Sequence, residues 1–175
     1  MKTSIIVPCY NEESNIEEFY NELKKHISTI DSEFEILFIN DGSEDETESK
    51  IVSIAESDHN VKLISFIKNF GHQKALKAGI DKSNSDVVVT IDCDFQQPIM
   101  LIKEFMKKWD NGKFLVVHGI KKSNKTSLLR SLIVFFAYKI INLCNSNQID
   151  VNGSDFFLLD KKVVNEIKKI KNSNI

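Results

Sequence analysis

The sequence predicts an α/β fold in which a mostly parallel, twisted sheet is flanked by helices. Short apolar runs alternate along the chain with segments whose apolar residues recur at helical spacing. Residues 86–91 form a nearly continuous β-branched run, which is typical of a strand that is buried on both faces. Because strands and helices alternate in this way, we expect βαβ units around a parallel sheet.

The first part of the chain supplies three predicted strands, each followed by a helix. The strands cover 4–7, which Pro8 closes, 35–39 and 61–66. A Ser-x-x-Glu capping box at 14–17 starts the first helix, and its apolar face consists of Ile16, Phe19, Tyr20, Leu23 and Ile27.

The later elements follow the same alternation. A second Ser-x-x-Glu pattern at 43–46 starts the next helix, and the third helix covers 72–82, with His72 as a polar capping residue. The remaining predicted elements are a strand at 86–91, a helix at 99–109 and a strand at 114–118.

Length and composition limit the class of protein. The 175 residues fit a single domain over 1–175, and 42% hydrophobic with 27% charged residues excludes a disordered or fibrous chain. The net charge of -2 disfavours a dedicated nucleic-acid binder. Three widely spaced cysteines predict neither a disulfide framework nor a zinc site and favour the reducing cytoplasm. No signal peptide is expected, and the longest apolar run, 132–138, is too short to span a bilayer.

Acidic side chains follow three of the predicted strands at the point where each strand ends. Glu12 and Glu13 follow the first strand, Asp41 follows the second, and Asp92 with Asp94 follows the fourth. Since parallel strands point the same way, these carboxylates are expected at one edge of the sheet, where ligands of such folds bind. Their mutual repulsion requires a positive partner, and a Mg²⁺ or Mn²⁺ ion that carries a nucleotide diphosphate is the simplest one.

Asp92 and Asp94 are the sharpest of these signals. Residues i and i+2 of an extended segment face the same way, so both carboxylates can reach one ligand assembly. The alternative is that they cap the helix at 99–109 or belong to an ordinary loop. Asp41 is expected to hydrogen-bond a base or ribose, to form an Asx turn, or both. Glu12 and Glu13 bind a ligand or complement a helix N-terminus.

Other motifs narrow the chemistry further. Gly71 allows close backbone approach at a helix N-terminus, which favours anions. The sequence has no G-x-G-x-x-G, G-x-x-x-x-G-K-[ST] or G-x-S-x-G motif. A haloacid-dehalogenase-like phosphatase also uses Asp-x-Asp after a strand. There the motif usually leads the fold, whereas here it follows three strands and Gln96 replaces the expected Thr or Val.

Four segments, in this order, carry a resemblance to a known family. They are 6–13 (IVPCYNEE), 38–43 (FINDGS), 68–73 (KNFGHQ) and 92–98 (DCDFQQP). Together they resemble the inverting family 2 glycosyltransferases with the GT-A fold. Within that family they are most similar to the polyprenyl-phosphate branch, which includes bactoprenol glucosyltransferases and dolichol-phosphate mannose synthase. The resemblance runs from about Ser4 to Val164.

The resemblance implies a donor site, a metal site and a base. The implied nucleotide-sugar-binding residues are Pro8, Tyr10, Glu12, Asp41, Lys68, Gly71, Asp92 and Asp94. Asp92 and Asp94 also bind the Mg²⁺ or Mn²⁺ ion, and Asp94 acts in catalysis through this ion, which neutralises the leaving diphosphate. Asp155 is the implied base near the acceptor, and a surface Asp before a strand is the alternative. If the acceptor is already a phosphate anion, Asp155 chiefly positions groups.

The acceptor side is implied by basic and apolar residues in the later part of the chain. Lys121, Lys122 and Arg130 are expected to contact the acceptor phosphate or an anionic membrane, and a solvated loop is the alternative. Residues 125–145 are expected to form an amphipathic helix on the bilayer surface, or else to pack on the core. These features place the protein peripherally on the cytoplasmic face of the cell membrane.

The implied activity is that of a metal-dependent hexosyltransferase. It moves a sugar from a UDP-sugar, expected to be UDP-glucose, to a polyprenyl phosphate. The alternatives are a family 2 transferase with another glycan acceptor and a nucleotide-sugar binder without turnover. Lys68, Lys121 and Phe157 stand where Arg is common. The chain stops at Ile175 where the family continues, so a C-terminal truncation is expected. The sequence leaves open whether the protein forms a homo-oligomer.

Overall fold

The computed structural model describes residues 1–112, 114–120 and 153–170. Its internal contacts divide the chain into a unit of Met1–His118 with Asp155–Ile175 and a second unit of Gly119–Ser154. All the residues of the candidate site described below belong to the first unit. Within the described ranges, no helix is both long and apolar enough to cross a membrane.

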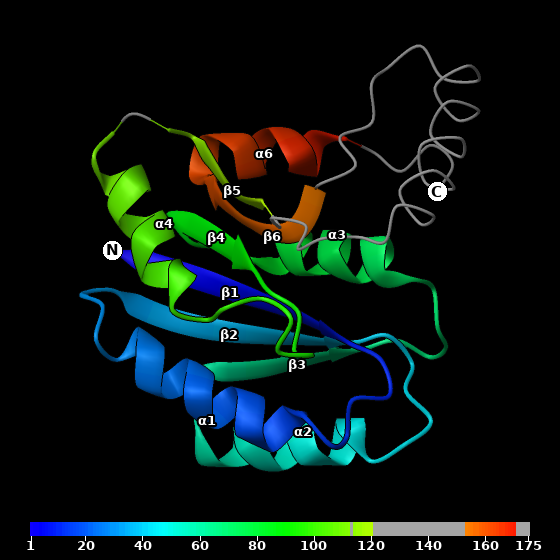
Figure 1. Ribbon diagram of the computed structural model, residues 1–175. Coiled ribbons are helices and arrows are strands. Elements are labelled where there is room, and N and C mark those ends of the chain that lie inside the picture. The colour runs from blue at the N-terminus through cyan, green and yellow to red at the C-terminus, as the bar shows by residue number, and fades with distance from the viewer. Residues whose placement is uncertain (113, 121–152, 171–175) are drawn as a thin grey trace, which may run out of the picture. The chain divides into compact units, whose positions relative to one another are not determined.

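A mixed six-stranded sheet forms the centre of the fold, in the order β3-β2-β1-β4-β6-β5 (Figure 1). β1 pairs in parallel with β2 and with β4, β2 pairs in parallel with β3, and β6 runs antiparallel to β4. The α/β prediction with a mostly parallel sheet is therefore confirmed. The strands are β1 (Lys2–Cys9), β2 (Glu33–Asn40), β3 (Val61–Ser65), β4 (Val87–Thr90), β5 (Val116–Ile120) and β6 (Gly153–Asp160).

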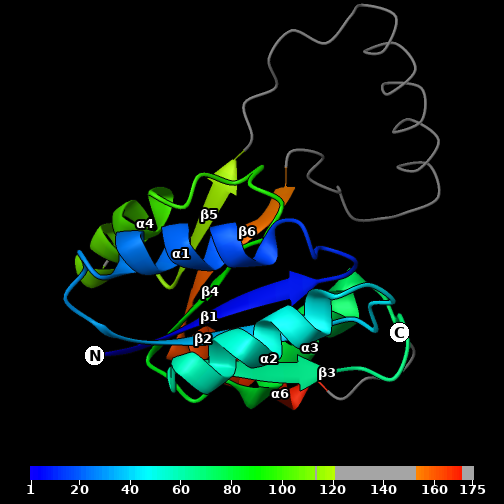
Figure 2. The same cartoon turned by 90° about the horizontal axis from the view of Figure 1, so that it is seen from below.

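Helices cover both faces of this sheet. They are α1 (Ile16–Ile27), α2 (Thr47–Ser57), α3 (His72–Lys82), α4 (Leu101–Asp110) and α6 (Lys161–Lys169). Buried side chains of α1, α2 and α4 belong to one core cluster, and those of α3 and α6 belong to another. Figure 2 shows α1 and α4 on the opposite side of the sheet from α3 and α6.

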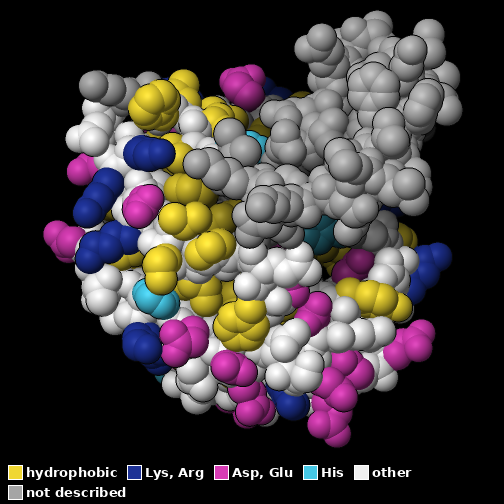
Figure 3. Space-filling view, viewed as in Figure 1, with side chains coloured by type: hydrophobic (Ala, Val, Ile, Leu, Met, Phe, Trp, Pro, Cys, Tyr) yellow, Lys and Arg dark blue, Asp and Glu magenta, His cyan; other side chains and the backbone are white. Residues whose placement is uncertain are grey.

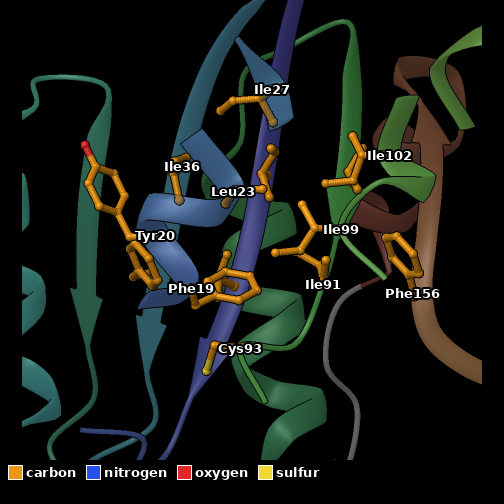
Figure 4. Close-up of a cluster of buried hydrophobic side chains, with 14 of the residues drawn as sticks. Phe19, Tyr20, Leu23, Ile27, Ile36, Ile91, Cys93, Ile99, Ile102 and Phe156 are labelled. Carbon is orange, nitrogen blue, oxygen red and sulfur yellow. The ribbon is translucent and has the colours of Figure 1, made fainter. Parts of the chain in front are cut away.

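The alternation of side chains along β1 explains the two cores. Ile5 and Val7 face the first cluster, whereas Ile6 between them faces the second. A strand that is buried on both faces must be apolar at every position, as the β1 and β4 sequences are for most of their length. Figure 4 shows the first cluster, in which Phe19 and Leu23 of α1 lie against Ile91 and Ile99.

The prediction of capping boxes at the first two helices is wrong. α1 begins at Ile16 and α2 at Thr47, and in neither case does the N-cap side chain accept a hydrogen bond from the helix. The physical reason is that the segments before these helices bond to each other. Backbone N–H groups of Asn11 and Glu12 donate to Ser43 Oγ and Thr47 Oγ1, and the Glu46 N–H donates to Glu13 Oε2.

Glu35 is a buried carboxylate in β2 and is only 6% exposed. It accepts a hydrogen bond from Ser4 Oγ at 2.5 Å and an ion-paired bond from Lys62 Nζ at 2.9 Å, and Lys2 Nζ lies 3.5 Å away. Burial alone would raise the pKa of Glu35, but these bonds and cations outweigh it and the pKa is lowered. Glu35 is therefore stabilised as an anion in the folded state.

This lowered pKa predicts an acid-dependent part of the stability. The contribution of Glu35 is fully present above its unfolded pKa of about 4.3 and is lost as the pH falls through the lower folded pKa. Glu35→Gln is expected to lower the free energy of unfolding at pH 7 by about 1–2 kcal/mol. The loss is modest because the Lys62 side chain is solvent-exposed, so water screens its ion pair with Glu35. Urea unfolding at pH 7 and pH 3 measures this difference, with the exposed Glu33→Gln on the same strand as control. An equal loss at both pH values would contradict the prediction.

Candidate functional site

A cleft of about 410 Å³ opens at the carboxyl ends of β1, β2 and β4. It gathers most of the donor-site residues expected from the sequence, together with the expected base. Those that line it are Pro8, Tyr10, Glu12, Asp41, Gly71, Asp92, Asp94 and Asp155. The expected convergence of acidic strand ends therefore takes place for Glu12, Asp41, Asp92 and Asp94. Glu13 does not line the cleft, and its Oε2 accepts from the Glu46 N–H instead.

Asp41 lies at the end of β2 and is only 3% exposed. Its two carboxylate oxygens accept hydrogen bonds from the backbone N–H groups of Phe70 at 2.7 Å and Gly71 at 2.9 Å. No Asx turn forms at Asp41, and the neighbouring Asn40 instead accepts, through its Oδ1, a hydrogen bond from the N–H of Ser43 three residues further along, at 3.0 Å. In this structure, Asp41 ties the segment before α3 to the end of β2.

Gly42 and Gly71 make this close approach of two backbones feasible. Gly42 has a φ of +68°, and a Cβ atom there would lie 2.2 Å from the carbonyl carbon of Lys68. Gly71 has a φ of +98° and is the N-cap of α3, so the chain turns sharply into the helix at the cleft wall. Of the first turn of α3, His72 and Ala75 line the cleft.

Asp92 and Asp94 leave β4 on a braced turn. Gln97 holds Asp92 from both sides, because its Nε2 donates to Asp92 Oδ2 at 2.6 Å and its Oε1 accepts from the Asp92 N–H at 3.0 Å. Phe95 adopts a φ of +59°, which is uncommon for a non-glycine residue, and its ring packs on Phe19 at 5.8 Å. The Asp94 carboxylate accepts from the Gln96 N–H at 2.9 Å and is partly exposed.

Asp155 reaches the cleft through the pairing of β6 with β4. Thr90 and Phe157 are partners in this antiparallel register, so Asp155 stands opposite Asp92 two residues further along. Thr90 Oγ1 donates to the backbone carbonyl of Asp155, which fixes the main chain at this point. The three carboxylates of Asp92, Asp94 and Asp155 thereby share one cleft.

The electrostatics of this cleft are those of crowded anions. Burial raises the pKa of Asp92, the nearby His72 opposes this, and the negative charges of Asp94 and Asp155 raise it further. A divalent cation would relieve this repulsion. The described residues contain no group of three His, Cys, Asp or Glu side chains that is arranged to hold a metal by itself. The site therefore fits an ion that takes one or two carboxylates and completes its shell with phosphate oxygens and water.

Several cleft residues were not expected from the sequence. They are Cys9, Asn69, His72, Ala75 and Cys93. The role of His72 as a polar cap is wrong, since no side-chain cap bond forms at α3 and the imidazole Nε2 lies 3.1 Å from Asp155 Oδ2. His72 directly follows Gly71 at the start of a helix, on the edge of the sheet where ligands bind in such folds. This position could have identified it as a cleft residue. Burial raises the pKa of the Cys9 thiol, and its contact with Cys93 adds to this, so Cys9 stays protonated.

Other expected contacts lie elsewhere. Lys68 is not among the residues that line the cleft, and its ammonium group lies 5.3 Å from the centre of the Phe70 ring. Lys121, Lys122, Arg130 and the expected helix at 125–145 fall outside the described residues.

On the face in Figure 3, acidic side chains gather where α1 and α2 lie in Figure 1, and such a surface repels polyanions.

Comparisons with known proteins agree with this geometry. Glycosyl transferase family 2 matches residues 4–168 of the chain. The chain is 39% identical over 175 residues to a bactoprenol glucosyl transferase of Shigella phage SfV, which covers 100% of this chain and 57% of that protein. The chain thus spans little more than half the length of the curated relatives it matches.

Solved structures resemble the fold. A mannosyltransferase from Pyrobaculum calidifontis in complex with GDP-Man and Mn²⁺ has a TM-score of 0.64 and 18% identity, and covers 95% of this chain and 46% of its own. TarS 1–349 of S. aureus in complex with UDP has a TM-score of 0.56 and 26% identity, and covers 73% of this chain and 38% of its own. The expected GT-A fold is confirmed.

The hydrogen bonds of Asp41 predict a structural cost when its carboxylate is changed. Asp41→Asn is expected to lower the free energy of unfolding of the ligand-free protein by about 1–3 kcal/mol. The amide offers one acceptor oxygen to two backbone N–H groups in a buried position. Urea unfolding measures this loss. Asp94→Asn is the matched control, because its remaining oxygen still accepts from Gln96, and a change within about 0.5 kcal/mol is expected. Equal stability of Asp41→Asn and the wild type would contradict the bracing role.

Proposed function

The chain belongs to glycosyl transferase family 2, and we propose that it transfers a sugar from a UDP-sugar, UDP-glucose in particular, to a polyprenyl phosphate with inversion at the anomeric carbon. The observation that carries this proposal is the convergence of Asp41, Asp92 and Asp94 in one cleft at the carboxyl edge of the sheet. The acceptor is proposed from the similarity to a protein named as a bactoprenol glucosyl transferase.

The nucleotide is proposed to bind at the β1 and β2 side of the cleft. Pro8, Tyr10 and Glu12 form the wall that follows β1, and Tyr10 is 43% exposed, which leaves its ring free to contact a base. Asp41 and Gly71 form the opposite wall and hold each other through the bond described above. The structural relative TarS, which was solved with UDP, supports a uridine nucleotide.

A Mg²⁺ or Mn²⁺ ion is proposed to bind Asp92 and Asp94 together with the donor diphosphate. The raised pKa of Asp92 and the shared cleft of Asp92 and Asp94 support a cation at this position, and such an ion can complete its shell with phosphate oxygens. When bound, such an ion neutralises the charge that builds on the leaving diphosphate. Asp94 would hold the ion from a turn that Phe95 and Phe19 brace.

The acceptor is proposed to enter beside Asp155. Its carboxylate is 42% exposed and lies on β6, away from the β1 and β2 wall. It would take a proton from a hydroxyl acceptor or position a phosphate acceptor. Lys121, Lys122 and Arg130 are proposed to contact the acceptor phosphate, and a helix at 125–145 to lie on the cytoplasmic face of the membrane.

Donor binding provides the first test. The chain is expected to bind UDP in the presence of Mn²⁺, and Asp94→Asn is expected to weaken this binding at least tenfold, because one of two carboxylates that face the ion is lost. Isothermal titration calorimetry with and without Mn²⁺ measures the affinity. Asp31→Asn, an exposed carboxylate outside the cleft, should leave it unchanged. UDP binding that ignores both Mn²⁺ and Asp94 would contradict the donor site.

Transfer provides the second test. The protein is expected to move labelled glucose from UDP-glucose to a short polyprenyl phosphate, and Asp155→Asn is expected to lower the rate by about 10²-fold, because the phosphate acceptor is then less well positioned. Thin-layer chromatography of the lipid product measures the rate. Metal-dependent UDP binding without any transfer would favour the alternative of a binder without turnover. Release of phosphate from small phosphate esters would favour a phosphatase instead.

A further inference from the structure

The two oxygens of the Asp155 carboxylate lie near polar side chains of the first turn of α3. His72 Nε2 lies 3.1 Å from Asp155 Oδ2, and Gln73 Nε2 donates to Asp155 Oδ1 at 3.5 Å. The main chain of Asp155 is fixed separately, through the bond from Thr90 on β4. The backbone of Asp155 thus depends on β4 and the direction of its side chain depends on α3.

His72 pairs with Asp155 in preference to the other nearby carboxylate. Its Nε2 lies 3.6 Å from Asp92 Oδ1, which is further than its 3.1 Å to Asp155. Asp92 already has its own donor, since Gln97 Nε2 bonds to Asp92 Oδ2 at 2.6 Å. The imidazole also stands between two carboxylates that would otherwise face each other without a donor group between them.

The Nε2 atom of His72 is buried, and the Asp155 oxygen at 3.1 Å is not aligned well enough to count as its hydrogen-bond partner. Catalytic hydrogen bonds are often poorly aligned before substrate binds and tighten in the substrate complex. A buried polar atom without an aligned partner costs free energy, so a small rotation that completes this bond is favourable. The contact is therefore close to formation before any ligand is bound.

The start of α3 is held firmly enough for such a role. Asp41 binds the two N–H groups immediately before His72, and Gly42 packs against the backbone of Lys68.

We propose that His72 is a positioning residue that orients Asp155 for the acceptor through its Nε2–H group, with Gln73 holding the second oxygen. This inference rests on the proposed function, because Asp155 has a task only if an acceptor binds beside it. It assigns the first turn of α3 to the acceptor half of the reaction, although the same helix start also borders the donor cleft.

Kinetics of single and double variants test the inference. His72→Ala is expected to lower the rate of glucose transfer at saturating UDP-glucose and Mn²⁺ about 10-fold to 100-fold. His72→Gln should recover part of the rate, since its amide also donates a hydrogen bond. The double variant His72→Ala with Asp155→Asn should be no slower than Asp155→Asn alone, because His72 acts through Asp155. Multiplied losses would overturn the proposal.

A measurement on the ligand-free protein keeps the inference separate from the activity. ¹⁵N NMR of the imidazole rings should detect an Nε2–H group on His72, and Asp155→Asn should shift this signal. The His26 and His59 signals serve as internal controls that should not move. A wild-type chain that transfers no sugar would contradict the proposed function alone. A His72 signal that ignores Asp155→Asn would overturn the positioning role, whatever the activity.

Discussion

The hydrogen bonds between the Asp41 carboxylate and the backbone N–H groups of Phe70 and Gly71 are the constraint on which the rest of the site depends. They join the end of β2 to the start of α3 in a buried position, where an unpaired N–H group would be costly. Because α3 begins there, its first turn borders the cleft. The sequence suggested Asp41 as a ligand contact or a local turn residue, whereas the structure makes it a tie between β2 and α3.

The cleft concentrates negative charge, and no Lys or Arg among the described residues lines it. Asp92, Asp94 and Asp155 face the same space, and burial with mutual repulsion raises the pKa of Asp92. By contrast, Glu35 is buried elsewhere with Ser4 and Lys62, and its pKa is lowered. The two carboxylates differ because Glu35 is ion-paired with a lysine of the fold. The divalent ion of the proposed metal-diphosphate complex would supply positive charge beside Asp92.

Local signals misplaced the helix starts because tertiary bonds replaced them. The Ser-x-x-Glu patterns at 14–17 and 43–46 have the composition of capping boxes, yet the loops after β1 and β2 satisfy each other's backbone groups instead. Ser43 illustrates this, since its hydroxyl accepts from Asn11 and donates to Asn40 rather than capping α2. A capping rule considers only neighbours in sequence, whereas Asn11 and Ser43 are 32 residues apart in the chain.

The sequence by itself determined the α/β fold and the edge at which the acidic residues gather, because periodicity and β-branched runs specify buried strands, and parallel strands end on one side. Only the tertiary structure decided which side chains meet there. β6 inserts between β4 and β5 and runs antiparallel to β4, and this pairing brings Asp155 opposite Asp92 and against His72. No local pattern encodes that insertion, since it depends on packing between segments that are distant in sequence.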